Sequence, residues 1–199
     1  MLKVAKKHEA MKKLEERVKT CRKCPLGELR TNAVPGSGSY ESKIMFVGEG
    51  PGYWEDQKGL PFVGRAGKVL DELLESIGLT RDEVYITNII KCRPPNNRDP
   101  TEEEIKTCSP YLDMQIDLLR PKIIVPLGRH SMSYILKKFG FEPEPISKIH
   151  GKTFEARTLF GKIVIMPIYH PAVALYRPQL REELEKDFKK LRTLLDDLL

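Results

Sequence analysis

The sequence has no apolar run long enough to cross a membrane, since a spanning helix needs about 20 consecutive apolar residues and all runs here are far shorter. It also has no internal repeat and no low-complexity tract. Its first residues, MLKVAKKHEA, are charged and lack the apolar centre of a secretory signal. We therefore expect no membrane partner and take the cytoplasm as the compartment.

The familiar phosphate-binding fingerprints are missing too. The glycine-rich segment at residues 48–52 is GEGPG, which does not match GxGxxG, and no Lys-Ser or Lys-Thr pair follows it. These absences exclude a dinucleotide fingerprint and a P-loop. On its own the segment predicts only a tight turn.

The size and charge of the chain indicate one basic domain. Its 199 residues, 40% of them hydrophobic, can bury one core, so we expect a single domain over residues 1–199 and a monomer. An excess of 34 Lys and Arg over 28 Asp and Glu favours a polyanionic partner such as nucleic acid. The alternative is a surface rich in Lys and Glu, as in proteins adapted to heat.

Short runs rich in Ile and Val alternate with helical patterns. The alternation predicts a three-layer α/β/α sandwich with a central, mainly parallel four-stranded sheet. Thr101 and Glu104 form a capping box at the start of one helix. The predicted strands cover residues 44–47, 84–87, 123–127 and 163–168, and the predicted helices cover 3–19, 66–77, 101–119, 130–139 and 182–198. We also predict a further strand at 153–158 and an ordered loop or linker at 25–39.

Polar residues follow three of the predicted strands. Glu49, Asn88 and His170 each stand where a strand ends, and in such sheets the ligand site lies beyond the carboxyl ends. Phe62, in a glycine-bounded loop, is either a stacking ring or part of the core. An acid, a ring, an amide and an imidazole are the groups needed to read and release a nucleic-acid base.

Each of these residues also has a structural interpretation. Glu49 alone could be a solvated loop carboxylate, and His170 alone a hydrogen-bonded strand terminus. Of the other histidines, His8 is interpreted as a surface residue, and His130 and His150 as structural or close to DNA rather than catalytic.

The four cysteines, Cys21, Cys24, Cys92 and Cys108, form a CxxC pair followed by two single residues. Disulfides are not expected in a chain without a secretion signal, so metal binding is the favoured interpretation and free buried cysteines the alternative. Four thiolates suit tetrahedral zinc or a [4Fe–4S] cluster, and spacing alone does not separate them.

Several motifs in one order give the chain a family resemblance. It resembles the family 4 uracil-DNA glycosylases, which are iron–sulfur, thermostable members of the uracil-DNA glycosylase superfamily, over nearly its whole length. The motifs are CRKCPL at 21–26, GEGPG at 48–52, EDQKGLPFVGRAG at 55–67, TNIIKCRPPNNR at 87–98, LG at 127–128 and HPA at 170–172.

The resemblance implies a role for each site residue. Asn88 would hydrogen-bond the uracil edge, Phe62 would stack on the flipped base, and Gly48 and Gly50 would contact it through their backbone. His170 would stabilise the departing uracil anion at O2. Glu49 would orient or deprotonate the attacking water, with help from Asn97. The four cysteines would ligate a [4Fe–4S] cluster, and no catalytic metal is implied.

Two positions depart from the best-known branch of the superfamily. Gly50 stands where that branch has an aspartate, and Gly52 stands where it has a bulky ring that excludes the thymine methyl. Glu55 is therefore our candidate for rejecting thymine. The remaining expected DNA contacts are of two kinds. Phosphate would be contacted by Arg65, Lys68 and Arg177 and by backbone amides of Gly50, Gly52 and the GRAG turn. Leu175 and Arg177 would enter the space that the flipped base leaves.

The predicted activity is that of a monofunctional repair enzyme. It would flip uracil out of single- or double-stranded DNA and hydrolyse the N-glycosidic bond, leaving an abasic site. A sliding clamp is carried as a further candidate partner. Two alternatives remain: a four-cysteine module that binds nucleic acid without catalysis, and a glycosylase of the same superfamily that prefers another damaged base.

Overall fold

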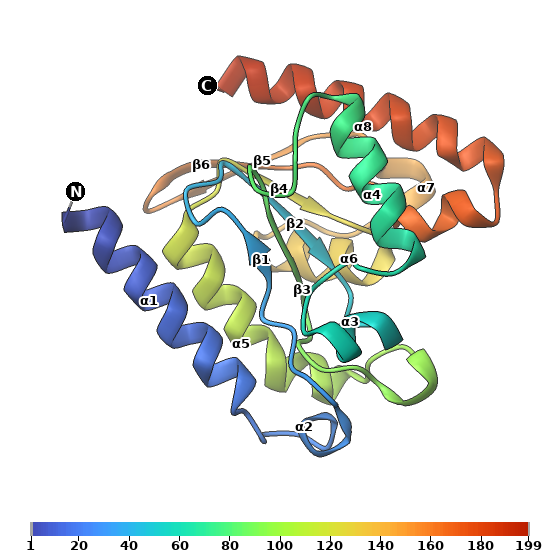
Figure 1. The fold of residues 1–199 in the computed structure, drawn as a ribbon. Coiled ribbons are helices and arrows are strands. Elements are labelled where there is room, and N and C mark those ends of the chain that lie inside the picture. The colour runs from blue at the N-terminus through green and yellow to red at the C-terminus, as the bar shows by residue number, and fades with distance from the viewer. Residues whose placement is uncertain (1, 199) are drawn as a thin grey trace.

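The computed structural model describes residues 2–198 and contains one six-stranded sheet (Figure 1). The strands are ordered β1-β3-β2-β4-β6-β5 across the sheet. Their bounds are Ser37–Gly38 (β1), Ile44–Gly48 (β2), Tyr85–Asn88 (β3), Ile123–Pro126 (β4), Phe154–Thr158 (β5) and Gly161–Ile165 (β6).

The predicted parallel core of the sheet is confirmed, and the predicted count of four strands is wrong. Strands β3, β2, β4 and β6 are parallel neighbours, as expected. An antiparallel strand is added at each edge, β1 beside β3 and β5 beside β6. β1 was missed because two residues in a Gly- and Ser-rich segment leave no hydrophobic pattern to detect. β5 was expected as a further strand, and it forms a hairpin with β6.

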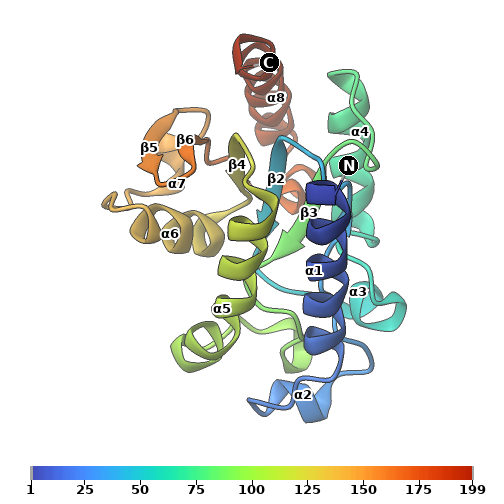
Figure 2. The same ribbon diagram turned by 90° about the vertical axis from the view of Figure 1, so that its left-hand side faces the viewer.

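Helices cover both faces of the sheet, which gives the predicted three layers (Figure 2). Side chains alternate along β2: Met45 and Val47 join the core beneath α1, α5 and α6, whereas Ile44 and Phe46 join the core beneath α4 and α8. The bounds of the helices are Leu2–Lys19 (α1), Leu26–Leu29 (α2), Tyr53–Lys58 (α3), Arg65–Ser76 (α4), Glu102–Leu119 (α5), Arg129–Lys138 (α6), Ile146–Ile149 (α7) and Pro178–Leu198 (α8), with 3-10 turns at Pro95–Asn97 and Pro171–Leu175.

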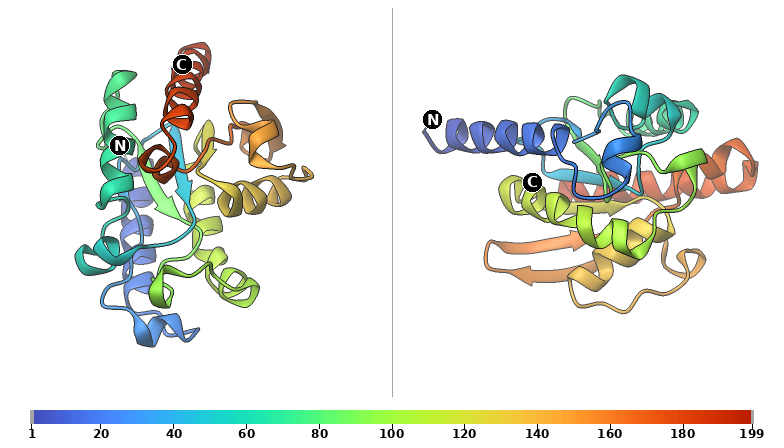
Figure 3. Two further views of the ribbon diagram at one scale, coloured as in Figure 1. Left: turned by 90° about the vertical axis from the view of Figure 1, so that its right-hand side faces the viewer. Right: turned by 90° about the horizontal axis from the view of Figure 1, so that it is seen from below.

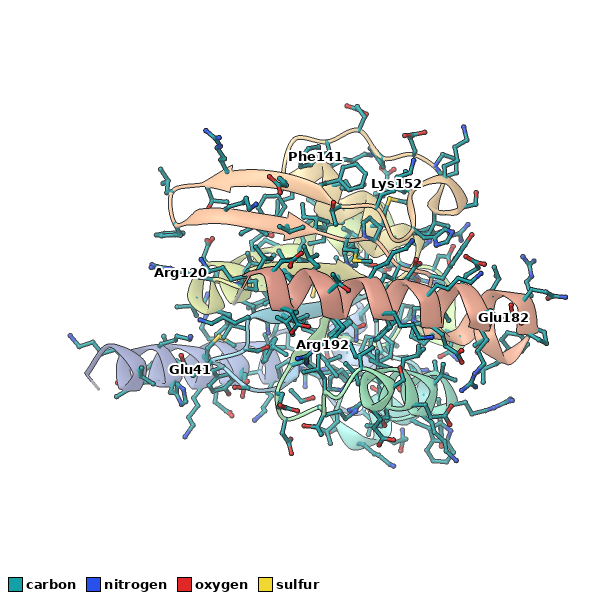
Figure 4. All side chains as sticks on the ribbon, turned by 90° about the horizontal axis from the view of Figure 1, so that it is seen from above. Glu41, Arg120, Phe141, Lys152, Glu182 and Arg192 are labelled. Carbon is teal, nitrogen blue, oxygen red and sulfur yellow. The ribbon has the colours of Figure 1, made fainter. Side chains whose placement is uncertain are left out.

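The C-terminal helix α8 closes one layer. Figure 4, seen from above, shows α8 with Glu182 and Arg192 lying between the β5–β6 hairpin and α4. Phe188, on its inner face, stacks on Phe46 of β2 with ring centroids 5.9 Å apart. No helix in the described part of the chain is both long and apolar enough to cross a membrane.

The carboxyl ends of the parallel strands converge at one edge of the sheet (Figure 3). Gly48, the last residue of β2, is the register partner of Asn88, the last residue of β3. A bridge between Leu127 and Ile168 extends the neighbouring pair to the same edge. Glu49, Asn88 and His170 therefore all leave the sheet at this edge, as the sequence predicts.

Candidate active site

A cavity of about 520 Å³ opens at this edge of the sheet and collects most of the predicted site residues. Because a single base is far smaller, the cavity has room for a flipped base together with its sugar. It is lined by Glu49, Gly50, Pro51, Gly52, Glu55, Phe62, Ala66, Asn88, Ile90, Pro94, Asn97, Arg98, His170, Ala172 and Tyr176.

Asn88 is a buried amide without a protein partner. The residue is 2% exposed. In the described chain no protein group is hydrogen-bonded to its carboxamide, and since no buried polar side-chain atom there lacks a partner, the carboxamide opens onto the cavity. The amide lies against Gly48 so closely that a Cβ there would stand 2.2 Å from Asn88 Oδ1 and 2.8 Å from the ring of Phe62. A glycine at position 48 is thus what lets the amide and the ring approach the same point.

Phe62 is held in an unfavourable backbone conformation. Its φ is 50°, which a bulky residue rarely adopts outside a functional or constrained site. Its backbone carbonyl accepts a hydrogen bond from Arg81, and it packs so closely on α4 that a Cβ at Gly67 would stand 1.8 Å from that carbonyl oxygen. The ring stacks on His170, with centroids 5.5 Å apart and planes inclined by 27°.

His170 is fixed as a neutral donor. Its Nδ1 accepts a hydrogen bond of 3.2 Å from the backbone N–H of Ala172, so in the neutral ring the proton is on Nε2. Burial lowers the pKa of His170 to about 4, and the carboxylate of Glu55 only partly offsets this. At neutral pH the ring therefore presents an uncharged N–H donor.

Glu49 is half-buried at the end of β2, with 32% of its side chain exposed. Burial raises the pKa of its carboxyl group, and the negative charge of Asp99 raises it further, while His130 and Arg129 lower it. A raised pKa makes the carboxylate a better proton acceptor.

Glu55 braces two loops of the cavity wall. Its carboxylate accepts hydrogen bonds from the backbone N–H groups of Val63 and Gly64, at 2.8 and 2.9 Å, and from that of Gly52 at 3.2 Å. A Cβ at Gly52 would stand 2.9 Å from Glu55 Oε2. The carboxylate therefore fills the space in front of Gly52.

Gly50, the other position that differs from the best-known branch of the superfamily, also has a physical reason to be glycine. A Cβ at Gly50 would stand 2.6 Å from Cγ1 of Ile90, so the isoleucine occupies the space that a side chain at position 50 would need.

Asn97 lines the cavity with φ of 54° and accepts a hydrogen bond from Arg93 Nε at 2.7 Å. That bond uses its carbonyl oxygen and leaves its NH2 group free to donate.

The remaining predicted residues lie around the cavity mouth or behind it. Gly48 forms the wall behind Asn88 and Phe62 and does not line the cavity. Arg65 and Lys68 are exposed in the first turn of α4, and Arg177 is exposed before α8. Leu175 packs partly buried against the α4–α8 core.

Sequence reasoning missed Tyr176, which lies between the two predicted wedge residues. Its side chain is 75% exposed and lines the cavity. An aromatic residue in the loop that follows the HPA motif was the available signal. His130, interpreted as structural from the sequence, lies 3.6 Å from the carboxylate of Glu49.

The four cysteines lie together although the chain separates them widely. None forms a disulfide, and all four contribute to the same core cluster. Two sulfurs already receive donors: Cys92 Sγ accepts from Arg30 Nη1 at 2.9 Å, and Cys108 Sγ accepts from the backbone N–H of Lys91 at 3.2 Å. Burial raises the pKa of Cys108 to about 11, with neighbouring thiols adding to the shift. Four thiolates here need a compensating positive centre.

The four sulfurs do not form a compact set in the described chain. Tetrahedral zinc, with Zn–S bonds of about 2.3 Å, holds its sulfurs about 3.8 Å apart. In the described part of the chain, a set of three ligand atoms all within 4.8 Å of one another occurs at Glu49, Asp99 and His130 and not at the cysteines. Four thiol donors in one cluster suit either a tetrahedral zinc ion or a [4Fe–4S] centre.

Fold and cavity together define an α/β/α protein with a cavity of about 520 Å³ beyond the carboxyl ends of its parallel strands. Residues 35–199 match the family model of the uracil DNA glycosylase superfamily. The chain belongs to this superfamily.

Individual relatives narrow the relationship. The chain is 55% identical over 187 residues to the type-4 uracil-DNA glycosylase of Sulfurisphaera tokodaii, covering 94% of this chain and 85% of that protein. It is 52% identical over 186 residues to the type-4 enzyme of Archaeoglobus fulgidus, covering 94% of each chain. Over 193 residues it is 44% identical to the type-4 enzyme of Thermotoga maritima, covering 95% of this chain and 96% of that protein.

The state of His170 can be measured directly. We expect ¹⁵N NMR of the imidazole to find the Nε2–H tautomer throughout the neutral range and protonation only near pH 4, because burial disfavours the imidazolium. The exposed His8 on α1 supplies a reference signal. Protonation of His170 near its ordinary pKa of about 6.5 would contradict the assignment of a neutral donor.

Proposed function

We propose that this chain removes uracil from DNA, leaving an abasic site for base excision repair. The observation that carries the proposal is the buried Asn88 amide, which has no protein partner in the described chain and faces a cavity beside the stacked rings of Phe62 and His170. Its polar atoms open onto the cavity, so both the carbonyl and the NH2 group are available to a ligand there. The names of the type-4 relatives support uracil as that ligand.

Recognition follows from the chemistry of the amide. The carbonyl of Asn88 accepts from N3–H of uracil, and its NH2 group donates to O4. Cytosine offers an acceptor at N3 and an amino group at C4, so it faces the wrong partner at each position. Phe62 supplies the stacking surface for the extruded ring.

Two residues carry out the hydrolysis: Glu49 activates the water, and His170 stabilises the departing uracil. Glu49 orients a water molecule and takes its proton as the water oxygen bonds to C1′ of the sugar. The bond from C1′ to N1 breaks, and its electron pair passes to the uracil ring. The neutral Nε2–H of His170 donates to O2, where negative charge develops. Asn97, with its free NH2 group at the cavity wall, assists in holding the water.

Thymine is excluded by Glu55 in this proposal. The braced carboxylate fills the space in front of Gly52, where a bulkier residue would otherwise meet the 5-methyl group. Because its three backbone hydrogen bonds hold it in place, it acts as a fixed wall.

DNA is held by the rim of the cavity. Helix α4 begins at Gly64 with no side-chain cap and no acidic residue in its first turn, and Arg65 and Lys68 are exposed beside it, so this end of the helix suits a phosphate. Gly50 approaches the base through its backbone, while Gly48 acts through Asn88 and Phe62, which pack against it. The 3-10 turn that ends at Leu175 presents Tyr176 and Arg177 to the gap in the duplex.

The cysteine site is proposed to hold one [4Fe–4S] cluster, ligated by Cys21, Cys24, Cys92 and Cys108. When bound, it supplies the positive centre that four buried thiolates require and cross-links the loops around it. The chain's own contribution is the pair of donors to Cys92 and Cys108. No step of the hydrolysis passes through this site.

The base-reading role is tested by exchanging Asn88 for Asp. We expect a uracil-containing oligonucleotide treated with the purified protein and then with alkali to break at the abasic site. Asn88→Asp should lower the rate of excision at least ~100-fold, because it replaces the donor to O4 by an acceptor and O4 gains negative charge as the bond breaks. Asn96→Asp, in the same loop system but outside the cavity lining, is the matched control and should stay near wild type. Wild-type rates from a folded Asn88→Asp protein would remove Asn88 as the reader, and a wild type without activity would leave the binding-module alternative.

Exclusion of thymine is tested with Glu55→Ala. Loss of the carboxylate weakens the loops, so uracil excision falls, while a thymine opposite guanine gains access. We expect the ratio of thymine to uracil excision to rise by about 10-fold or more, the scale on which one methyl group is discriminated. An unchanged ratio would show that another group rejects thymine.

The metal content of the purified protein distinguishes a [4Fe–4S] cluster from a zinc ion at the cysteine site. Protein purified without air should be brown and contain about four irons per chain, and Cys108→Ser should lose both colour and thermal stability. Colourless protein with a single zinc ion would overturn the cluster assignment.

A further inference from the structure

His130 lies beside the carboxylate of Glu49, the group proposed to activate the attacking water. Its Nε2 lies 3.6 Å from Glu49 Oε2 and 3.2 Å from Asp99 Oδ2. Asp99 in turn accepts a hydrogen bond of 2.6 Å from Arg129 Nη2. The four side chains therefore form one row, Arg129, Asp99, His130 and Glu49, that ends at the cavity.

This row of side chains explains why helix α6 begins with basic residues. A helix N-terminus favours acidic side chains, yet the first turn of α6 has none and instead carries Arg129 and His130. Their partners come from elsewhere in the chain, Asp99 from the loop before α5 and Glu49 from the end of β2. This pairing across elements fixes the imidazole relative to Glu49, since one ring nitrogen faces both carboxylates.

From this geometry we propose that His130 is a positioning residue for the hydrolysis, holding the Glu49 carboxylate ionised and oriented toward the water. The inference rests on the proposed uracil excision. Asp99 orients the ring through its hydrogen bond with Nε2, which also faces the Glu49 carboxylate across 3.6 Å, and Arg129 holds Asp99. His130 itself does not line the cavity, so it acts through Glu49 and not on the base.

The charges around Glu49 determine the sign of the expected effect. His130 and Arg129 lower the pKa of the Glu49 carboxyl group, whereas burial and Asp99 raise it. The other charged groups along the cavity are engaged elsewhere: Arg98 is bonded to Glu104, and Glu55 to backbone N–H groups. Removing His130 therefore raises the pKa of Glu49. Because the water-activating form is the carboxylate, the acidic limb of the rate profile then moves to higher pH.

The test compares His130→Leu with His130→Gln under single-turnover conditions on uracil DNA, between about pH 5 and about pH 9, with EDTA present. For His130→Leu we expect the acidic limb to rise by about one pH unit and the plateau rate to fall about 10-fold, with the affinity for DNA unchanged. His130→Gln keeps an N–H donor near the Nε2 position and should recover the plateau rate to within about threefold. His8→Gln, at a surface histidine bonded to Glu41, is the control.

Each outcome has a distinct meaning. If wild type excises uracil but folded His130→Leu keeps both its plateau rate and its acidic limb, His130 does not position Glu49. If His130→Leu and His130→Gln lose the same plateau rate while the acidic limb of the pH–rate profile stays in place, His130 has only a structural role, which also overturns the proposal. Loss of wild-type activity in EDTA with the iron content unchanged would mean that Glu49, Asp99 and His130 hold a metal ion, which contradicts the proposed pairing of His130 with Glu49. A wild type without uracil excision removes the proposed function itself.

Discussion

The close approach of two side chains to the backbone of Gly48 is the constraint on which the site depends. Parallel pairing puts Gly48 opposite Asn88, and the missing side chain lets the amide and the ring of Phe62 meet above the end of β2. The strained backbone of Phe62, the tight packing of Gly67 and the stacking on His170 all follow from holding that ring in place. The energy for this arrangement comes from the two large apolar layers on either side of the sheet.

Much of this was accessible from the sequence because parallel sheets follow simple rules. Runs of Ile and Val that are buried on both faces predict the central strands, and the residue after each strand predicts where polar side chains gather. Glu49, Asn88 and His170 meet in one cavity for this reason. The two edge strands were harder, because β1 is too short to show a period and β5 depends on its hairpin partner.

The details that sequence could not supply are contacts between segments far apart in the chain. Nothing in the pattern around Glu55 indicates that its carboxylate spans two loops, and nothing around His130 indicates that Asp99 and Glu49 lie beside it. The spacing of four cysteines likewise does not reveal that all four join one core cluster, which only the fold shows. In each case, the missing information is a distance in space between segments that the sequence pattern treats separately.

Lys91 connects the cysteine site to the base-reading residue. Its backbone N–H is bonded to the sulfur of Cys108, while its buried ammonium group is bonded at 2.7 Å to the carbonyl oxygen of Asn88. One residue thus ties the backbone of the reader to a thiol. If Asn88 reads the base as proposed, a change at that thiol is two hydrogen bonds of one residue away from it, so oxidation at the cysteine site and base selection share one short stretch of backbone.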